Sequence, residues 1–231
     1  MNILILPVNF PRTKESHSYI FARDQAEALS INYNVQVVGT IFVPLKDLLN
    51  EGFDSLGFKE YQYSKVSIRL LCLPSIPKAK RVRQFLRDFF NWRLIRGFSR
   101  NIDLIHLHSY ASGKAAIMMK EEYGVPYIVT EHSSQFINGK ISSFDFKLAN
   151  KVFSNSASNI AVSEPFKHEL ENKFKLNFKV VFNFVDTKYF TPSRSSFSRG
   201  YKFLTVGNLV PVKNHELIIR AFNEAFKYSD N

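Results

Sequence analysis

Short runs of β-branched and aliphatic residues alternate along the chain with longer segments of helical periodicity. Continuous apolar runs indicate buried strands, and apolar residues that recur about every three to four positions indicate amphipathic helices. Their alternation predicts a parallel sheet covered by helices on both faces, the doubly wound, Rossmann-like α/β fold. The expected strands are 2–6, 35–39, 66–73, 104–108, 127–131, 159–163 and 179–182, and the expected helices are 19–29, 82–98, 113–123 and 164–174.

The pattern changes after residue 182. Residues 183–200 contain Pro192, several serines and little apolar periodicity, which is typical of a linker. We therefore predict a first domain over 1–182, a linker over 183–200 and the beginning of a second Rossmann unit over 201–231. That unit would contain a strand at 202–206, a loop at 207–214 and a helix at 216–226. One strand and one helix cannot bury a domain core, so we expect this second domain to be truncated.

Composition limits the class of protein without choosing a function. A chain with 45% hydrophobic and 22% charged residues is typical of a globular protein, and its net charge of +11 favours polyanionic partners. These include phosphorylated ligands, anionic lipid surfaces and nucleic acid. A single cysteine, Cys72, rules out an intramolecular disulfide and favours a cytoplasmic location.

Ligands of open parallel sheets bind at the carboxyl ends of the strands, so residues that follow the strands are the candidates. The loop after the first strand contains Ser16 and His17 and leads into a helix, whose N-terminus favours a phosphate or a sugar hydroxyl. An ordinary polar surface loop would have the same composition. The loop lacks the GxGxxG pattern, which removes the main support for a dinucleotide-binding dehydrogenase.

Two histidines alternate in the strand 104–108. His106 is expected in the core, whereas His108 ends the strand and is expected at the ligand edge. No third ligand follows at a spacing typical of zinc, so we expect no metal site.

His132 follows the strand 127–131 directly. An imidazole at this position can donate a hydrogen bond to a sugar hydroxyl or to charge that develops on a leaving phosphate. The alternative is that the polar residues here only cap the next helix.

A fourth candidate is the loop 207–214. Gly207 permits a close backbone approach, and Lys213 lies just before a helix, where a cation is unfavourable unless an anion lies between them. This arrangement favours phosphate binding, although a solvated lysine that points away would cost little.

Several motifs occur here in the order seen in one enzyme family. The chain resembles family 4 glycosyltransferases of the GT-B fold through Asp103-Leu-Ile-His-Leu-His108, Gly124-Val-Pro-Tyr-Ile-Val-Thr-Glu-His132, Asn159-Ile-Ala-Val-Ser163, Asn183-Phe-Val-Asp186 and Val206-Gly-Asn-Leu with Lys213. The resemblance implies retaining transfer of a hexose-type sugar from a nucleotide-sugar donor to a glycan or lipid-linked acceptor, as in cell-surface polysaccharide synthesis. It also implies that no metal or other cofactor is required.

The resemblance also implies roles for particular residues. His132 matches the catalytic position beside the donor sugar, and Lys213 matches a lysine that contacts the donor diphosphate. Gly207 and Asn208 belong to the same donor-binding stretch, where Asn208 replaces a common arginine and removes one positive charge. Contacts to the acceptor or the sugar are expected from Ser16, His17, His108 and Ser163.

Residues 78–100 combine eight basic residues with an apolar stripe that includes Val82, Phe85 and Phe89. Such a helix can lie on an anionic membrane surface, which for a cytoplasmic protein is the inner face of the cell membrane. Alternatively, it can pack its apolar stripe on the sheet. Nucleic-acid binding lacks any supporting motif, so we expect no nucleic-acid partner. The remaining alternatives to an active transferase are an inactive remnant and a non-catalytic α/β domain that binds polyanions.

Overall fold

The computed structural model describes residues 1–16, 18–98, 100–133, 135–137, 139, 141–187, 189–191 and 202–227. The chain divides into two compact units, Met1–Val185 and Asp186–Asn231. The proposed linker falls largely outside the described residues, so the domain bounds deduced from the sequence remain a prediction.

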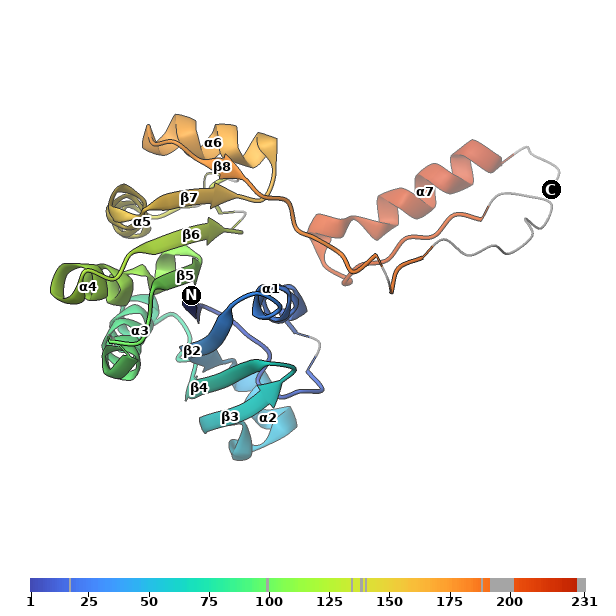
Figure 1. Ribbon diagram of the computed structural model, residues 1–231. Helices are drawn as coiled ribbons and strands as arrows, with labels where there is room; N and C mark the ends of the chain where they lie inside the picture. The colour runs from blue at the N-terminus through green and yellow to red at the C-terminus, as the bar shows by residue number, and fades with distance from the viewer. Residues whose placement is uncertain are drawn as a thin grey trace. The chain divides into compact units, whose positions relative to one another are not determined.

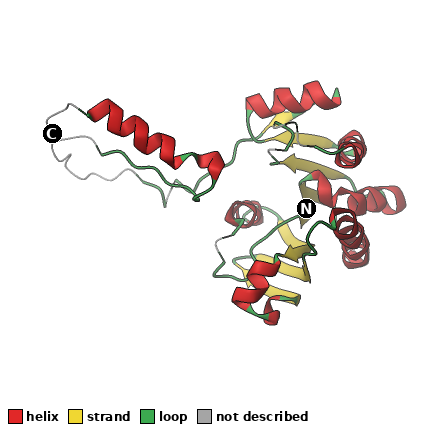
Figure 2. Cartoon of the chain, turned by 180° about the vertical axis from the view of Figure 1, so that it is seen from behind, coloured by secondary structure: helices red, strands yellow, loops and turns green. Residues whose placement is uncertain are grey.

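The first unit contains one eight-stranded sheet in the order β3-β4-β2-β1-β5-β6-β7-β8. Its strands lie side by side with helices on both faces (Figures 1 and 2). All neighbouring strands are parallel except β3 and β4, which pair antiparallel. The strands are β1 (Asn2–Pro7), β2 (Asn34–Val43), β3 (Gly57–Tyr63), β4 (Val66–Pro74), β5 (Leu104–His108), β6 (Tyr127–Glu131), β7 (Ser158–Ala161) and β8 (Lys179–Val180). The doubly wound fold is therefore confirmed.

The alternation of side chains in the strands divides the core between the two faces of the sheet. On one face, Ile3 and Ile5 pack with Ala22 and Ala26 of α1. On the other face, Leu4 and Leu6 share a cluster with residues of α3, α4, α5 and α6. The helices of this unit are α1 (Ile20–Ser30), α2 (Leu45–Glu51), α3 (Lys80–Ile95), α4 (Gly113–Tyr123), α5 (Ser143–Asn155) and α6 (Glu164–Phe174).

Three elements of this unit were absent from the sequence prediction: α2, β3 and α5. Strand β3 is an edge strand whose Phe58, 60% exposed, and charged Lys59 and Glu60 give it no continuous apolar run. Helix α5 begins where Ser142 Oγ accepts a hydrogen bond from the Asp145 backbone N–H, 3.1 Å away, which is a typical N-cap. Strand β3 carries a weaker hydrophobic pattern than the strands at the centre of the sheet, whereas α5 has buried Ala149, Val152 and Phe153 on one face and was overlooked.

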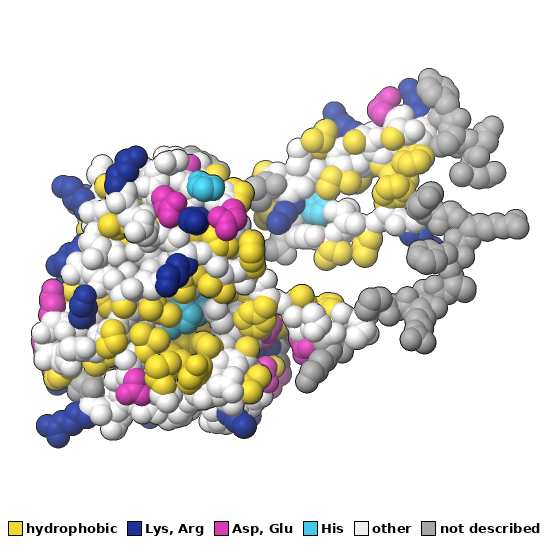
Figure 3. Space-filling view, turned by 45° about the horizontal axis from the view of Figure 1, so that its top comes forward, with side chains coloured by type: hydrophobic (Ala, Val, Ile, Leu, Met, Phe, Trp, Pro, Cys, Tyr) yellow, Lys and Arg dark blue, Asp and Glu magenta, His cyan; other side chains and the backbone are white. Residues whose placement is uncertain are grey.

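The second unit contains helix α7 (His215–Phe226), preceded by the short 3-10 turn Pro211–Lys213. The helix confirms the one expected at 216–226. The strand expected at 202–206 is not formed, and Leu204 and Val206 there are 87% and 85% exposed. A strand requires a partner that accepts its backbone hydrogen bonds, and no described residue of this unit provides one. Hydrophobic side chains gather on the surface of this unit (Figure 3).

Candidate functional site

The strand register places the ends of four strands, each followed by or containing a candidate residue, at the same edge of the sheet. Pro7, the last residue of β1, is opposite His108 of β5, and Glu131 of β6 is opposite Ala161 of β7. Since parallel strands end together, the residues after these positions form the carboxyl edge where ligands of this fold bind.

Glu131 fixes the backbone at this edge. Its carboxylate is fully buried and accepts hydrogen bonds from the backbone N–H groups of Tyr110 at 3.0 Å, His132 at 3.1 Å and Ser133 at 2.9 Å. Burial raises the pKa of Glu131, while these hydrogen bonds act in the opposite direction. One side chain therefore holds together the loops that follow β5 and β6, including the backbone of His132.

Three imidazole rings lie next to one another at the edge. The ring centroids of His106 and His108 are 4.7 Å apart, and those of His108 and His132 are 5.6 Å apart with nearly parallel planes. Phe21 of α1 contacts His132 at a centroid distance of 4.9 Å. The structure thus brings His108 and His132 together, as expected for two residues of one site.

Burial keeps the three rings neutral. Loss of solvent lowers the pKa of both His106 and His132 to about 4, and it lowers that of His108 well below its ordinary value. A neutral imidazole carries one N–H donor and one acceptor nitrogen, so each ring can take part in neutral hydrogen bonding near pH 7.

The three rings differ in their partners. The Nε2 of His106 lies 2.8 Å from Thr130 Oγ1, which confirms that His106 is a core histidine with a satisfied polar atom. Both ring nitrogens of His108 and the Nε2 of His132 are buried without a hydrogen-bond partner among the described residues. Buried polar atoms of this kind normally have a partner, so these nitrogens are the ones suited to a bound ligand or water.

Two of the other sequence candidates already use their polar groups within the fold. The Ser163 Oγ accepts the Phe166 backbone N–H at 3.3 Å and caps α6. The Ser16 Oγ accepts the Ser18 backbone N–H at 3.4 Å, and the carbonyl of Ser16 accepts from Arg23. His17 lies outside the described residues. Contacts from these positions to a sugar remain predictions.

In the second unit, the loop before α7 brings three candidates into one stretch. A Cβ on Gly207 would lie 3.5 Å from His215 Nε2 and 3.6 Å from Lys213 Cγ, which are ordinary contact distances. The Asn208 carbonyl accepts the Val210 backbone N–H at 2.8 Å. Gly207 and Lys213 are therefore neighbours in space, and the protein's own side chains do not require glycine at position 207.

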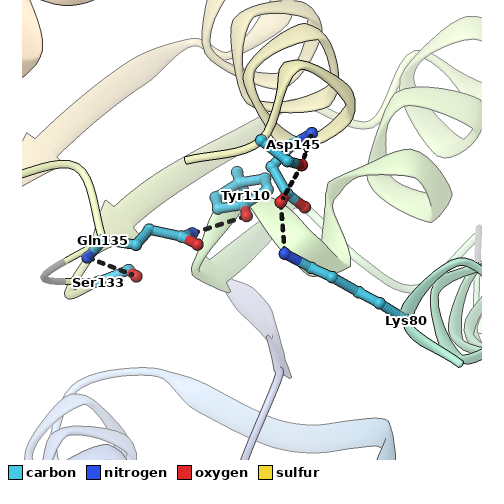
Figure 4. A network of polar contacts seen from close by, with 6 residues as sticks. Lys80, Tyr110, Ser133, Gln135 and Asp145 are labelled. Atoms are coloured by element: carbon cyan, nitrogen blue, oxygen red, sulfur yellow. Dashed lines mark hydrogen bonds and ion pairs between the residues drawn. The ribbon is translucent and has the colours of Figure 1, made fainter. Parts of the chain in front are cut away.

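A polar network that sequence reasoning missed lies beside this edge (Figure 4). Gln135 Nε2 donates to Tyr110 Oη at 2.7 Å, and the Gln135 backbone N–H donates to Ser133 Oγ at 3.4 Å. Lys80 at the beginning of α3 donates to Asp145 Oδ2, which also accepts from Ser142 Oγ at 2.5 Å. Burial would raise the pKa of Asp145, but the Lys80 and Ser142 hydrogen bonds hold it below its ordinary value. The one sequence signal was the unusual number of polar residues between β6 and α5.

The basic segment 78–100 differs from the expectation that its whole apolar stripe packs on the sheet. Its stripe does not pack on the sheet as a whole, because Val82, Phe85 and Phe89 are 49%, 63% and 48% exposed. Only the end of the stripe packs inward, since Ile95 is fully buried and Trp92 packs against the core. Polar Asn91 is also fully buried, and its Oδ1 accepts the Thr40 backbone N–H at 2.8 Å. Helix α3 thus uses Asn91 to satisfy a backbone group of the sheet, while Phe85 and Phe89 lie on its outer face.

Two further observations concern metals and membranes. Among the residues that the structure describes, no group of three or more His, Cys, Asp or Glu side chains could hold a metal ion. None of the described helices is both long enough and apolar enough to cross a membrane. Independence of metals remains a prediction from the family resemblance.

The doubly wound sheet with histidines at its carboxyl edge places this protein among the Rossmann-like α/β proteins. Comparisons with known proteins identify its family. The model of Glycosyltransferase Family 4 matches residues 20–189, so the chain belongs to that family. An uncharacterized glycosyltransferase of Methanocaldococcus jannaschii is 27% identical over 174 residues, which cover 73% of this chain and 46% of the relative. The chain thus spans about half the length of this curated relative.

Solved structures agree on the fold. Sucrose-phosphate synthase from Thermosynechococcus elongatus has a TM-score of 0.60 at 14% identity, with 83% of this chain and 50% of that chain covered. HepE from Anabaena, solved with UDP and glucose, has a TM-score of 0.50 at 14% identity and covers 83% of this chain and 47% of its own. At such low identity these similarities establish a GT-B-type fold and nothing finer.

Proposed function

We propose that the protein transfers a sugar from a nucleotide-sugar donor to a hydroxyl of a glycan or lipid-linked acceptor, with retention at the anomeric carbon. The observation that carries this proposal is the buried, neutral His132 at the carboxyl edge of a chain that belongs to glycosyltransferase family 4. Family membership supports the transfer reaction, whereas the retaining outcome, the hexose and a role in cell-surface polysaccharide synthesis rest on the resemblance of the motifs.

In this proposal His132 is the catalytic residue that contacts the sugar. As a neutral imidazole it donates a hydrogen bond without adding a positive charge, and its Nε2 has no described partner that would compete. Glu131 fixes the backbone of His132 and Phe21 packs against its ring. Such preorganised contacts supply a large share of enzymatic rate enhancement, because they require little rearrangement during the reaction.

The donor diphosphate is assigned to Gly207, Asn208 and Lys213. The side-chain ammonium of Lys213 supplies positive charge, and Gly207 leaves space for an oxygen atom beside the backbone. The HepE structure contains UDP, which supports a nucleotide-sugar donor for a chain of the same fold. Asn208 offers hydrogen bonds without charge, so donor binding should depend strongly on Lys213.

A transfer assay tests the proposal. The protein, as its gene encodes it, would be incubated with a panel of labelled sugar nucleotides and with glycan and polyprenyl-phosphate-linked acceptors. We expect transfer from one donor class, retention of the anomeric configuration by NMR, and no loss of rate in EDTA. Absence of transfer across the panel in folded protein would favour the inactive or polyanion-binding alternative. Inversion of the anomeric configuration would refute retention, and a loss of rate in EDTA would refute independence of metals.

The outward face of α3 supports a second function, association with an anionic membrane surface. Phe85 and Phe89 stack with centroids 6.4 Å apart and are exposed, and the basic residues Arg81, Arg93 and Arg96 on and just after this helix are exposed as well. Aromatic residues insert at a lipid interface, and each nearby basic residue adds roughly 1 kcal/mol on an anionic bilayer. This location would bring the enzyme to a lipid-linked acceptor.

Vesicle sedimentation tests this second function. Phe85→Ser with Phe89→Ser should abolish binding to vesicles that contain phosphatidylglycerol, and binding of the wild type should weaken as salt increases. Phe58→Ser is the matched control, since Phe58 is equally exposed but belongs to β3. Equal binding by the double variant and the control would refute the membrane role of α3.

A further inference from the structure

A basic pocket lies where α3 and α5 begin. It has a volume of about 540 Å³ and is lined by Lys78, Ala79, Lys80, Arg81, Val82, Ser142, Ser143 and Phe144. Ligand pockets typically have volumes of ~300–1,000 Å³, so this one is large enough for a phosphorylated sugar or a diphosphate with part of its substituent.

The charge of the pocket is one-sided. Three of its lining residues are basic, none is acidic, and the first turn of α3 has no acid. Asp145 lies behind the pocket and binds Lys80 and Ser142, which leaves the charges of Lys78 and Arg81 without a described salt bridge. The Arg81 guanidinium lies 5.8 Å from the centre of the Phe144 ring, which also lines the pocket. The pocket therefore has a strong positive potential with donors suited to phosphate oxygens.

The backbone adds to this potential. Ala79, the residue that precedes α3, makes no side-chain cap hydrogen bond, and basic residues at a helix N-terminus repel the helix dipole unless an anion is present. Ser143, the first residue of α5, lines the same pocket. Basic residues and the beginnings of two helices thus converge on a single cavity.

We propose that this pocket binds the phosphate or diphosphate group of the acceptor through Lys78 and Arg81, with Lys80 as a positioning residue. The inference rests on the proposed transferase function, because the bound phosphate belongs to an acceptor only if the protein transfers a sugar. The phosphate is either that of a lipid headgroup or that of a soluble phosphorylated glycan, and both present the same oxygens to the pocket.

The network of Figure 4 connects the pocket to the edge of the sheet. Lys80 and Ser142 line the pocket and bind Asp145, which is also hydrogen-bonded to the Tyr110 side chain. The Tyr110 hydroxyl accepts from Gln135, whose backbone N–H donates to Ser133, the residue after His132. The backbone N–H of Tyr110 also donates to Glu131. An anion held in the pocket would therefore lie on the same scaffold that fixes the His132 backbone, as expected for one part of an acceptor site.

Calorimetry with inorganic diphosphate at low salt tests the pocket directly. We expect Lys78→Gln with Arg81→Gln to weaken binding about tenfold or more, because two charged contacts are lost. Arg93→Gln with Arg96→Gln is the matched control, since it removes the same charge from exposed positions outside the pocket, and it should change the affinity less than about threefold. All variants also carry Lys213→Gln, because the proposed donor site could otherwise bind the same probe. Equal unfolding midpoints would show that all variants fold.

The outcomes separate the alternatives. Equal losses in the pocket and control variants, or no binding of either probe, would overturn the proposal. A second probe, a short-chain phosphatidic acid that stays monomeric, identifies the source without a membrane surface: selective loss of its binding in the pocket variant supports a lipid headgroup, and selective loss with free diphosphate supports a soluble ligand. A protein that binds diphosphate in this pocket but transfers no sugar would refute the proposed function and leave the binding site established.

Discussion

Residues 159–163 and 202–206 are both short apolar runs, yet only the first contributes to a strand. Ile160 lies opposite Thr130 of β6 and Lys179 of β8, whereas Leu204 is 87% exposed and pairs with no described strand. The runs differ little in intrinsic preference for a strand. The difference teaches that a strand in this fold depends on its neighbours, because its stability comes from backbone pairing and burial on both faces.

The largest difference in stability between the two regions should come from shortening a buried aliphatic side chain. Ile105 of β5 is fully buried, so Ile105→Ala should lower the free energy of unfolding by about 2–5 kcal/mol. Leu204→Ala, the exposed counterpart, should change it by less than about 0.5 kcal/mol. Urea denaturation followed by circular dichroism measures both, and a comparable loss in Leu204→Ala would mean that residues 202–206 are buried in solution.

Substitution of one glycine in each unit compares the packing of the two units directly. A Cβ on Gly113 of α4 would lie 2.4 Å from Val152 Cγ2 of α5, so Gly113→Ala should cost about 1–3 kcal/mol of stability through overpacking. Gly207→Ala meets only ordinary contacts and should leave stability unchanged. If Gly207 serves the donor, the same variant should weaken binding of the sugar nucleotide, and calorimetry that found unchanged donor affinity would remove Gly207 from the site.

A smaller effect should come from the pH dependence of stability. The pKa of His106 is about 4 in the folded protein and about 6.5 in an unfolded chain, so the unfolded state binds more protons between these values. The contribution of His106 is therefore complete above pH 6.5 and is lost as the pH falls towards 4, at up to about 1.4 kcal/mol per pH unit.

Asp88 acts in the opposite direction, since burial raises its pKa to about 6, and His132 acts in the same direction as His106. The informative quantity is thus the difference between the wild type and His106→Gln. Urea denaturation at pH 7 and pH 5 should give a smaller loss of stability in the variant. Equal losses would show that His106 is not held in its neutral form.

Much of the fold could be predicted because the central strands carry continuous apolar runs that are buried on both faces. Strand β1 has this pattern, β5 and β6 have it apart from His106, His108, Thr130 and Glu131, and all three were predicted close to their observed bounds. Edge strand β3 could not be found, because partial exposure weakens a hydrophobic pattern. Helix α5 has an ordinary amphipathic pattern, with Ala149, Val152 and Phe153 buried, and was overlooked. The failed strand at 202–206 shows the opposite error, since an apolar run does not reveal whether a partner is present.

Some residues of the site could likewise be predicted from the sequence and others could not. His108 was predicted because it ends a strand and His132 because it follows one directly, and register then brings their rings together. Glu131 was missed as an anchor, since its function depends on backbone N–H groups of Tyr110 and Ser133 that no side-chain motif records. For the same reason, the inward direction of Asn91 and the outward direction of Phe85 required knowledge of the Thr40 backbone N–H, which donates to Asn91.

The most direct test of this account is the transfer rate of His132→Ala in the protein as its gene encodes it. Removal of one preorganised donor beside the reacting sugar should lower kcat about 10²–10³-fold. His168→Ala is the matched control, since His168 lies exposed on α6 and away from the strand edge. A large loss in His132→Ala with normal folding and an unaffected control would support His132 as the catalytic residue, whereas near-normal turnover of folded His132→Ala would contradict it.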